Sequence, residues 1–142
     1  MIGELPRRGV DDWGSGEYGA SRGGTKTHRG IDLACYSGTI IKSLVNGLVT
    51  KLGYPYSDDT SYRYVQVTES DGFKVRIFYI GPLVEIGDYV HFGDNIGVAQ
   101  DIAERYTSPD KYMVNHVHLE VKTPEGIYID PSEYLAGPEV QV

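Results

Sequence analysis

The sequence predicts an all-β domain, built as an antiparallel sheet sandwich or an open barrel. Short runs rich in β-branched and aromatic residues recur between turn signals about every 8–12 positions, a spacing typical of such folds. The 142 residues include 18 Gly and 12 Tyr, which favour tight turns and strands. Only residues 101–106 carry a helical pattern, so we expect helices to contribute little to the fold.

The predicted elements follow one another along one domain that covers residues 1–142. The first 27 residues are polar and glycine-rich, and residues 1–20 are expected to form an irregular N-terminal leader. Strands are expected over residues 32–35, 39–41, 47–52, 62–68, 73–80, 84–90, 94–99 and 115–122. Residues 126–129 are expected to close a hairpin, and residues 130–135 to form a terminal helical turn.

Three dipeptides predict how some of these strands are joined. Asn46-Gly47 predicts a hairpin turn, because this pair favours the backbone twist of two-residue loops. Asp71-Gly72 predicts the turn of a second hairpin. Gly81-Pro82 is expected to end the strand that precedes it, because proline cannot donate to a sheet ladder.

Composition and charge exclude several classes of protein. Hydrophobic residues make up 40% and charged residues 23%, as in soluble domains, and the net charge is -7. Such a charge repels nucleic acid and anionic membranes, and no apolar run is long enough to span a bilayer. The single cysteine, Cys35, rules out an internal disulfide. Residues 1–10 do not read as a secretory signal, so we expect synthesis in a reducing cytosol, and a monomer.

The strongest chemical signal is the run His116-Val117-His118-Leu119-Glu120-Val121. In a strand, alternate residues share a face, so the two histidines project side by side while the valines and leucine face the core. This arrangement suits two metal ligands, or one ligand beside one base. The alternative is a pair of surface or hydrogen-bonded core histidines.

A second signal is the run from His28 to Asp32, where Gly30 permits a tight or bulged backbone at a strand edge. Two imidazoles, one carboxylate and a water molecule would make an open tetrahedral zinc site, the arrangement of catalytic rather than structural zinc. His91 has no partner pattern and is expected on a surface turn. Cys35 is expected to be a small buried residue.

A set of motifs runs in order through residues 14–135: Ser21-Arg22-Gly23, His28-Arg29-Gly30-Ile31-Asp32, Gly38-Thr39, Gly47-Leu48-Val49, Val84-Glu85-Ile86-Gly87-Asp88-Tyr89-Val90, Gly93-Asp94-Asn95-Ile96-Gly97, the histidine run, and Asp130-Pro131-Ser132-Glu133-Tyr134-Leu135. This set resembles the lysostaphin/LytM-type zinc endopeptidases. The resemblance implies an antiparallel β fold with a groove, and hydrolysis of peptide bonds in bacterial peptidoglycan. It also implies that His28, Asp32 and His118 bind Zn²⁺, with His116 as general base.

The chain departs from this family in one place. The family usually has a further catalytic histidine in a Tyr-x-His-Leu strand, and by alignment Gly81 takes that position. The nearby Tyr79 is a candidate to replace it as an oxyanion donor, or else it is a packed strand aromatic. Arg22 is a candidate to orient a substrate carboxylate, or else it forms a salt bridge under the N-terminal segment.

Two runs of the chain are Gly16-Glu17-Tyr18-Gly19-Ala20-Ser21-Arg22 and Phe78-Tyr79-Ile80-Gly81-Pro82-Leu83. They resemble the leukocyte cell-derived chemotaxins, which keep the zinc site but are regarded as secreted signalling proteins without peptidase activity. Those proteins are disulfide-bonded, which a single cysteine forbids here. The sequence therefore favours a bacterial or bacteriophage zinc endopeptidase, such as an endolysin made in the cytoplasm that acts on the cell wall after release. Two alternatives remain open: a zinc-bearing module that binds wall fragments or a protein partner without cleaving, and a purely structural β domain without zinc.

Overall fold

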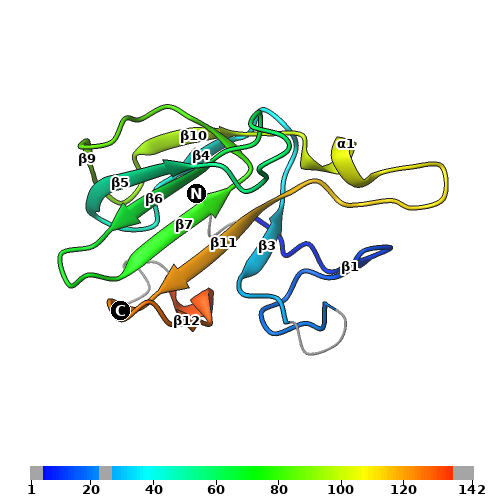
Figure 1. Cartoon of the computed structure of the whole chain (residues 1–142), viewed down its shortest axis with the longest axis horizontal. Coiled ribbons are helices and arrows are strands. Elements are labelled where there is room, and N and C mark those ends of the chain that lie inside the picture. The colour runs from blue at the N-terminus through cyan, green and yellow to red at the C-terminus, as the bar shows by residue number, and fades with distance from the viewer. Residues whose placement is uncertain (1–4, 23–26, 136–142) are drawn as a thin grey trace.

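The computed structural model describes residues 5–22 and 27–135 and shows an almost entirely β protein, as the sequence predicts (Figure 1). Its strands are β1 Val10–Asp11, β2 Gly14–Ser15, β3 Ile31–Ala34, β4 Ile40–Lys42, β5 Gly47–Gly53, β6 Tyr64–Thr68, β7 Lys74–Phe78, β8 Ile80–Pro82, β9 Tyr89–Val90, β10 Asn95–Ala99, β11 His116–Lys122 and β12 Tyr128–Ile129. The helix α1 covers Ile102–Tyr106, and the predicted terminal turn is a 3-10 helix, Pro131–Leu135.

The main sheet has the strand order β12-β11-β7-β6-β5-β9, and β3 pairs with the N-terminal part of β11. All of these pairs are antiparallel. One face of the sheet consists of apolar, almost fully buried side chains: Val49, Val65, Val67, Val75, Ile77, Val117, Leu119 and Val121. The alternate residues of the same strands, including His116 and His118, lie on the other face.

A second, three-stranded sheet with the order β4-β10-β8 packs against the apolar face of the main sheet (Figure 1). Its buried residues, Ile41, Ile80, Ile96 and Ala99, belong to the same hydrophobic cluster as those of the main sheet. The core therefore lies between two sheets, which leaves the opposite face of the main sheet free to carry polar side chains.

The predicted hairpin at Asn46-Gly47 is wrong. The strands on its two sides, β4 and β5, belong to different sheets. Gly47 serves another purpose, because a Cβ atom there would collide with the carbonyl oxygen of Thr68 on β6. The glycine permits close approach of β5 and β6. From the local sequence alone, a glycine needed for close approach looks the same as a glycine needed for a turn. The hairpin of β6 and β7 with its Asp71-Gly72 turn is confirmed.

The expected end of a strand at Gly81-Pro82 is also wrong. The interruption occurs at Tyr79, the only non-glycine residue with positive φ (69°) among the described residues. Gly81 and Pro82 lie within β8 and face Val98 and Gly97 of β10. Pro82 is tolerated because β8 is the edge strand of its sheet. Of the strand expected over residues 84–90, only Tyr89–Val90 forms.

The described part of the leader is more ordered than expected. Its strands β1 and β2 pair with each other, Arg7 forms a bridge to Leu33 of β3, and the Trp13 indole donates to the carbonyl of Tyr106. The segment therefore joins β3 to the C-terminal end of α1, whose N-terminus is capped by Asp101. Residues 1–4 of the predicted leader lie outside the described residues. None of the described helices is long and apolar enough to cross a membrane.

Candidate metal centre

The pairing of β3 with β11 brings His28, Asp32 and His118 together. Asp32 lies directly opposite His118 in the ladder, and His28 lies just before β3 begins. Gly30 stands between them where a Cβ atom would collide with the carbonyl oxygen of Leu119 and approach the His118 ring to 2.9 Å. A glycine is therefore required at this position for the His28 segment to reach the face of β11 that carries His118.

The ligand-type atoms of these residues converge on one point. His118 Nδ1 lies 2.8 Å from Asp32 Oδ1 and 3.0 Å from His28 Nε2, and His28 Nε2 lies 3.3 Å from Asp32 Oδ1. All three residues are buried, and their ligand atoms lie within 4.8 Å of one another. Two imidazole nitrogens and one carboxylate oxygen form a donor set of the kind found in open zinc sites, so the residues fit a zinc ion.

Hydrogen bonds outside this cluster fix which nitrogen of each histidine faces it. His28 Nδ1 donates a hydrogen bond to the carbonyl oxygen of Glu17 at 2.9 Å, which leaves Nε2 as the inner nitrogen. His118 Nε2 lies 3.0 Å from Glu120 Oε1, so it donates outward and Nδ1 is the inner nitrogen. A carboxylate behind a ligating histidine is the usual device for orienting the ring and raising its basicity.

The charges of the cluster support one another. Burial raises the pKa of Asp32, but hydrogen bonds from His118 and His28 outweigh it and hold this pKa well below its ordinary value. Burial lowers the pKa of His118, but hydrogen bonds to Asp32 and Glu120 raise it to about 9. The raised pKa favours a protonated His118 imidazole at neutral pH, with its Nδ1–H directed toward Asp32 Oδ1.

His116 lies beside the cluster with one free nitrogen. Its Nδ1 donates to the carbonyl oxygen of Val114 at 2.7 Å, which leaves Nε2 as an acceptor 3.5 Å from Asp32 Oδ2. Burial is the main reason that the pKa of His116 is lowered. A neutral imidazole next to a metal site can accept a proton from water.

Tyr79 faces the same cavity. Its backbone φ of 69° is rarely adopted by a residue with a side chain, and the phenol lies edge-on to His116 with 5.7 Å between the ring centroids. Burial raises the pKa of Tyr79 to about 12, so its hydroxyl stays protonated and can donate. Gly81, the position aligned with the missing family histidine, pairs with β10 and does not line the cavity.

Two arginines of the N-terminal segment reach the centre. Arg22 donates to the carbonyl oxygens of Ser15 (2.7 Å) and Ser21 (3.2 Å), and no carboxylate among the described residues forms an ion pair with it. The salt bridge considered as its alternative role is therefore absent from the described residues. Arg8, which the sequence pattern did not single out, donates to Asp32 Oδ2 at 2.8 Å and is buried.

These groups line one cavity of about 280 Å³. Its walls are formed by Arg8, Trp13, Arg22, His28, Asp32, Tyr56, Tyr79, Ile102, Tyr106, Met113, His116 and His118. Tyr56 contacts the hydroxyls of Tyr106 (2.5 Å) and Tyr79 (3.4 Å), so the phenols form a continuous wall. Sequence reasoning missed Tyr56 and Tyr106, since no local spacing relates them to the histidines.

His91 and Cys35 lie away from the cavity. The His91 side chain is 70% exposed on a turn, as expected. Cys35, expected to be a small buried residue, is only half-buried, and it borders a separate depression with Tyr36 and Tyr112.

Comparison with known proteins identifies a matching family and a curated relative. Residues 26–131 match Peptidase family M23. Leukocyte cell-derived chemotaxin-2 from Mus musculus is 27% identical over 128 residues, which cover 90% of this chain and 78% of that protein.

Several solved structures share the fold, including the following two. One is a mutant catalytic domain of the prophage-encoded M23 protein EnpA from Enterococcus faecalis, with a TM-score of 0.63 and 22% identity over 90% of this chain and 89% of that one. The other is the antimicrobial peptidase lysostaphin from Staphylococcus simulans, with a TM-score of 0.67 and 20% identity over 94% of this chain and 51% of that one. The match over residues 26–131 shows that the chain belongs to Peptidase family M23.

Proposed function

We propose that the chain is a zinc-dependent endopeptidase that hydrolyses peptide bonds of bacterial peptidoglycan. One observation carries this proposal: the inner nitrogens of His28 and His118 and the Asp32 carboxylate converge, while the free Nε2 of His116 lies beside them. A structural metal site is usually closed by four protein ligands, whereas three ligands beside a base suit hydrolysis.

The residues have distinct roles in this proposal. His28, Asp32 and His118 hold zinc, which when bound would polarise the scissile carbonyl and acidify a water molecule. His116 accepts the water proton at Nε2 and returns it to the leaving amine. The Tyr79 hydroxyl donates a hydrogen bond to the carbonyl oxygen as negative charge develops there. Arg22 anchors a substrate carboxylate through the guanidinium N–H groups that make no hydrogen bond to another described residue.

The similarities support peptidoglycan as the substrate class. The solved structures include a prophage-encoded M23 protein and an antimicrobial peptidase. We infer that this chain, like an endolysin, acts on a bacterial cell wall after it is released from the cell that makes it, and that it works as a monomer.

A second candidate function is a zinc-bearing module that recognises wall fragments or a protein partner without cleaving. It is favoured by the presence of Tyr79 beside His116 in the cavity. A histidine there could act as a second base in hydrolysis, whereas a protonated tyrosine hydroxyl cannot. The similarity to leukocyte cell-derived chemotaxin-2 points the same way.

Digestion of purified peptidoglycan by the zinc-loaded protein, followed by mass spectrometry of the fragments, separates the two functions. We expect new peptide ends that a His116→Ala variant forms about 10²–10⁴ times more slowly while it retains zinc. Tyr79→Phe should reduce the rate by about 10²–10³ if the hydroxyl donates to the oxyanion. His91→Ala, a change to an exposed histidine far from the cavity, should have no effect. Bound zinc with no new peptide ends on walls of several chemotypes would establish the binding module instead.

A further inference from the structure

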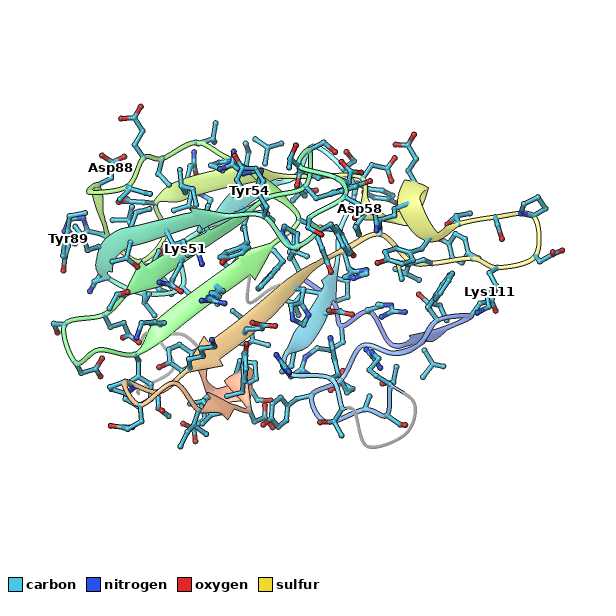
Figure 2. The ribbon with its side chains drawn as sticks, in the orientation of Figure 1. Lys51, Tyr54, Asp58, Asp88, Tyr89 and Lys111 are labelled. Carbon is cyan, nitrogen blue, oxygen red and sulfur yellow. The ribbon has the colours of Figure 1, made fainter. Side chains whose placement is uncertain are left out.

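The polar face of the main sheet carries a row of side chains next to the metal centre and a second row beyond it. Register places Lys51, Gln66, Arg76 and Glu120 side by side across β5, β6, β7 and β11. The next row contains Thr68, Lys74, Lys122 and Tyr128. Figure 2 labels Lys51 on the near side of the sheet, away from the second sheet, which lies behind.

These two rows form what we call the basic band: Arg29, Lys51, Lys74, Arg76 and Lys122. Arg29 joins it because its guanidinium lies 4.9 Å from the centre of the Tyr128 ring, which Lys122 also approaches to 4.7 Å. Five of the 13 basic residues thus gather on one face of a chain whose net charge is -7.

The cations of the basic band have no carboxylate partners within the described part of the chain. Among the described residues, the ion pairs of lysine and arginine involve Arg7, Arg8 and Arg105 only. Within the band, Lys51 and Arg76 lie over the Tyr64 ring, at 5.8 and 5.1 Å from its centre, and Arg76 donates to Gln66. Glu120, the carboxylate in the first row, is buried and turned toward His118.

We propose that the basic band binds the carboxylates of an acidic peptide whose backbone continues from the metal centre along the open face of the sheet. This inference rests on the proposed peptidase function and names the chemistry of the substrate on one side of the scissile bond. A carboxylate that enters the band meets unpaired lysine and arginine side chains, so no internal salt bridge has to break.

Register also sets how far the band lies from the centre. Asp32, His118, Phe78 and Tyr64 share one row, and the two rows of the band follow at successive steps of two residues along the strands. Two residues of a strand span about 7 Å, so the band lies roughly 7–14 Å from the row of His118. An extended peptide advances about 3.3–3.6 Å per residue, which places the recognised carboxylates about two to four residues from the bond at the centre.

A short acidic peptide fits this face better than a nucleic acid does. A nucleic acid presents a long array of phosphates that would extend beyond two rows and meet the acidic remainder of the chain. A peptide of a few residues confines its charges to the band. The partly exposed ring of Tyr128 additionally offers apolar surface to the peptide between its charged groups.

Binding measured without turnover tests the proposal separately from the peptidase function. Zinc-loaded His116→Ala protein is titrated into two fluorescent hexapeptides that differ only in carrying glutamate or glutamine side chains, and anisotropy gives the dissociation constants. We expect the glutamate peptide to bind about tenfold more tightly in low salt, with the difference shrinking as salt is raised. The comparison keeps its meaning even if the wild-type protein cleaves nothing.

Two variants with the same change in net charge locate the interaction. Lys74→Gln/Lys122→Gln removes two charges from the band, and Lys42→Glu makes an equal change on β4 in the other sheet. The double variant should lose about tenfold in affinity for the glutamate peptide, from two ion pairs of up to about 0.7 kcal/mol each, and Lys42→Glu less than twofold. The proposal would be overturned if the two peptides bound equally or if neither bound. It would also be overturned if Lys42→Glu lost as much affinity as the double variant, or if a DNA duplex bound more tightly than the glutamate peptide.

Discussion

Proton and zinc binding at His118 should be linked, and the linkage can be measured. In the metal-free protein, hydrogen bonds to Asp32 and Glu120 outweigh burial and raise the pKa of His118 to about 9. The same Nδ1 atom that faces Asp32 and His28 must lose this proton before it can ligate a metal. Raising the pH is therefore expected to strengthen zinc binding until the pH passes the pKa of His118.

The size of the effect follows from the fraction of His118 that is unprotonated. With a pKa of about 9, that fraction is about 1% at pH 7 and one half at pH 9, so the apparent zinc affinity should rise about 50-fold over this range. Close to one proton should be released for each zinc ion bound at pH 7. The slope should flatten above pH 9.

Calorimetric titration in buffers of different ionisation enthalpy counts the released protons, and competition with a chelator of known affinity follows the pH profile. In Glu120→Gln, one of the two carboxylates that hold the proton becomes neutral, so the bend of the profile should move below pH 9. Above pH 9 this variant should bind zinc about 10–100-fold more weakly, because the ring loses its supporting carboxylate. A zinc affinity independent of pH between 7 and 9, with no proton released, would refute this reasoning.

Three further predictions concern the metal, the core and the cysteine. Removal of zinc from protein held at a zinc concentration of about 100 times the dissociation constant should lower the free energy of unfolding by about 2.7 kcal/mol, and calorimetry that finds no change would contradict a site formed only in the folded state. Leu119→Ala, at a fully buried position of β11, should cost about 2–5 kcal/mol in urea unfolding, whereas a cost below about 1 kcal/mol would contradict the assigned core. Burial raises the pKa of Cys35 to about 11, so alkylation by iodoacetamide should accelerate about tenfold per pH unit from pH 8 to 10, while a plateau near pH 8.5 would indicate an ordinary thiol.

The parts of the fold that depend on local pattern could be predicted from the sequence. The alternation through residues 116–121 placed both histidines on one strand face and the apolar residues on the other, because the side-chain period of a strand is two. The hairpin of β6 and β7 was predicted for the same reason. The joining of His28, Asp32 and His118 rested on the family resemblance, since β3 and β11 are far apart in the sequence.

Features that depend on tertiary contact could not be predicted from local preference. Asn46-Gly47 has the chemistry of a turn, yet Gly47 is needed for the approach of β6. Alignment pointed to Gly81, but the positive φ of Tyr79 turns the chain so that the tyrosine faces the cavity and Gly81 joins β8. Neither the close approach at Gly47 nor the positive φ of Tyr79 is indicated by the residues next to it in the sequence.

Arg8 shows why the N-terminal segment matters to a centre formed by two other strands. Its guanidinium contacts Asp11 through Nε (2.9 Å) and Nη2 (2.6 Å), and Asp32 through Nη1 (2.8 Å). The negative charge of Asp11 balances the positive charge of Arg8. The negative charge of Asp32 therefore remains available to His28 and His118. Arg8 occupies Oδ2 of Asp32 and leaves Oδ1 facing the histidines, so the segment orients the carboxylate without neutralising it. A residue that no spacing pattern connects to the histidines thus sets the direction of their shared ligand.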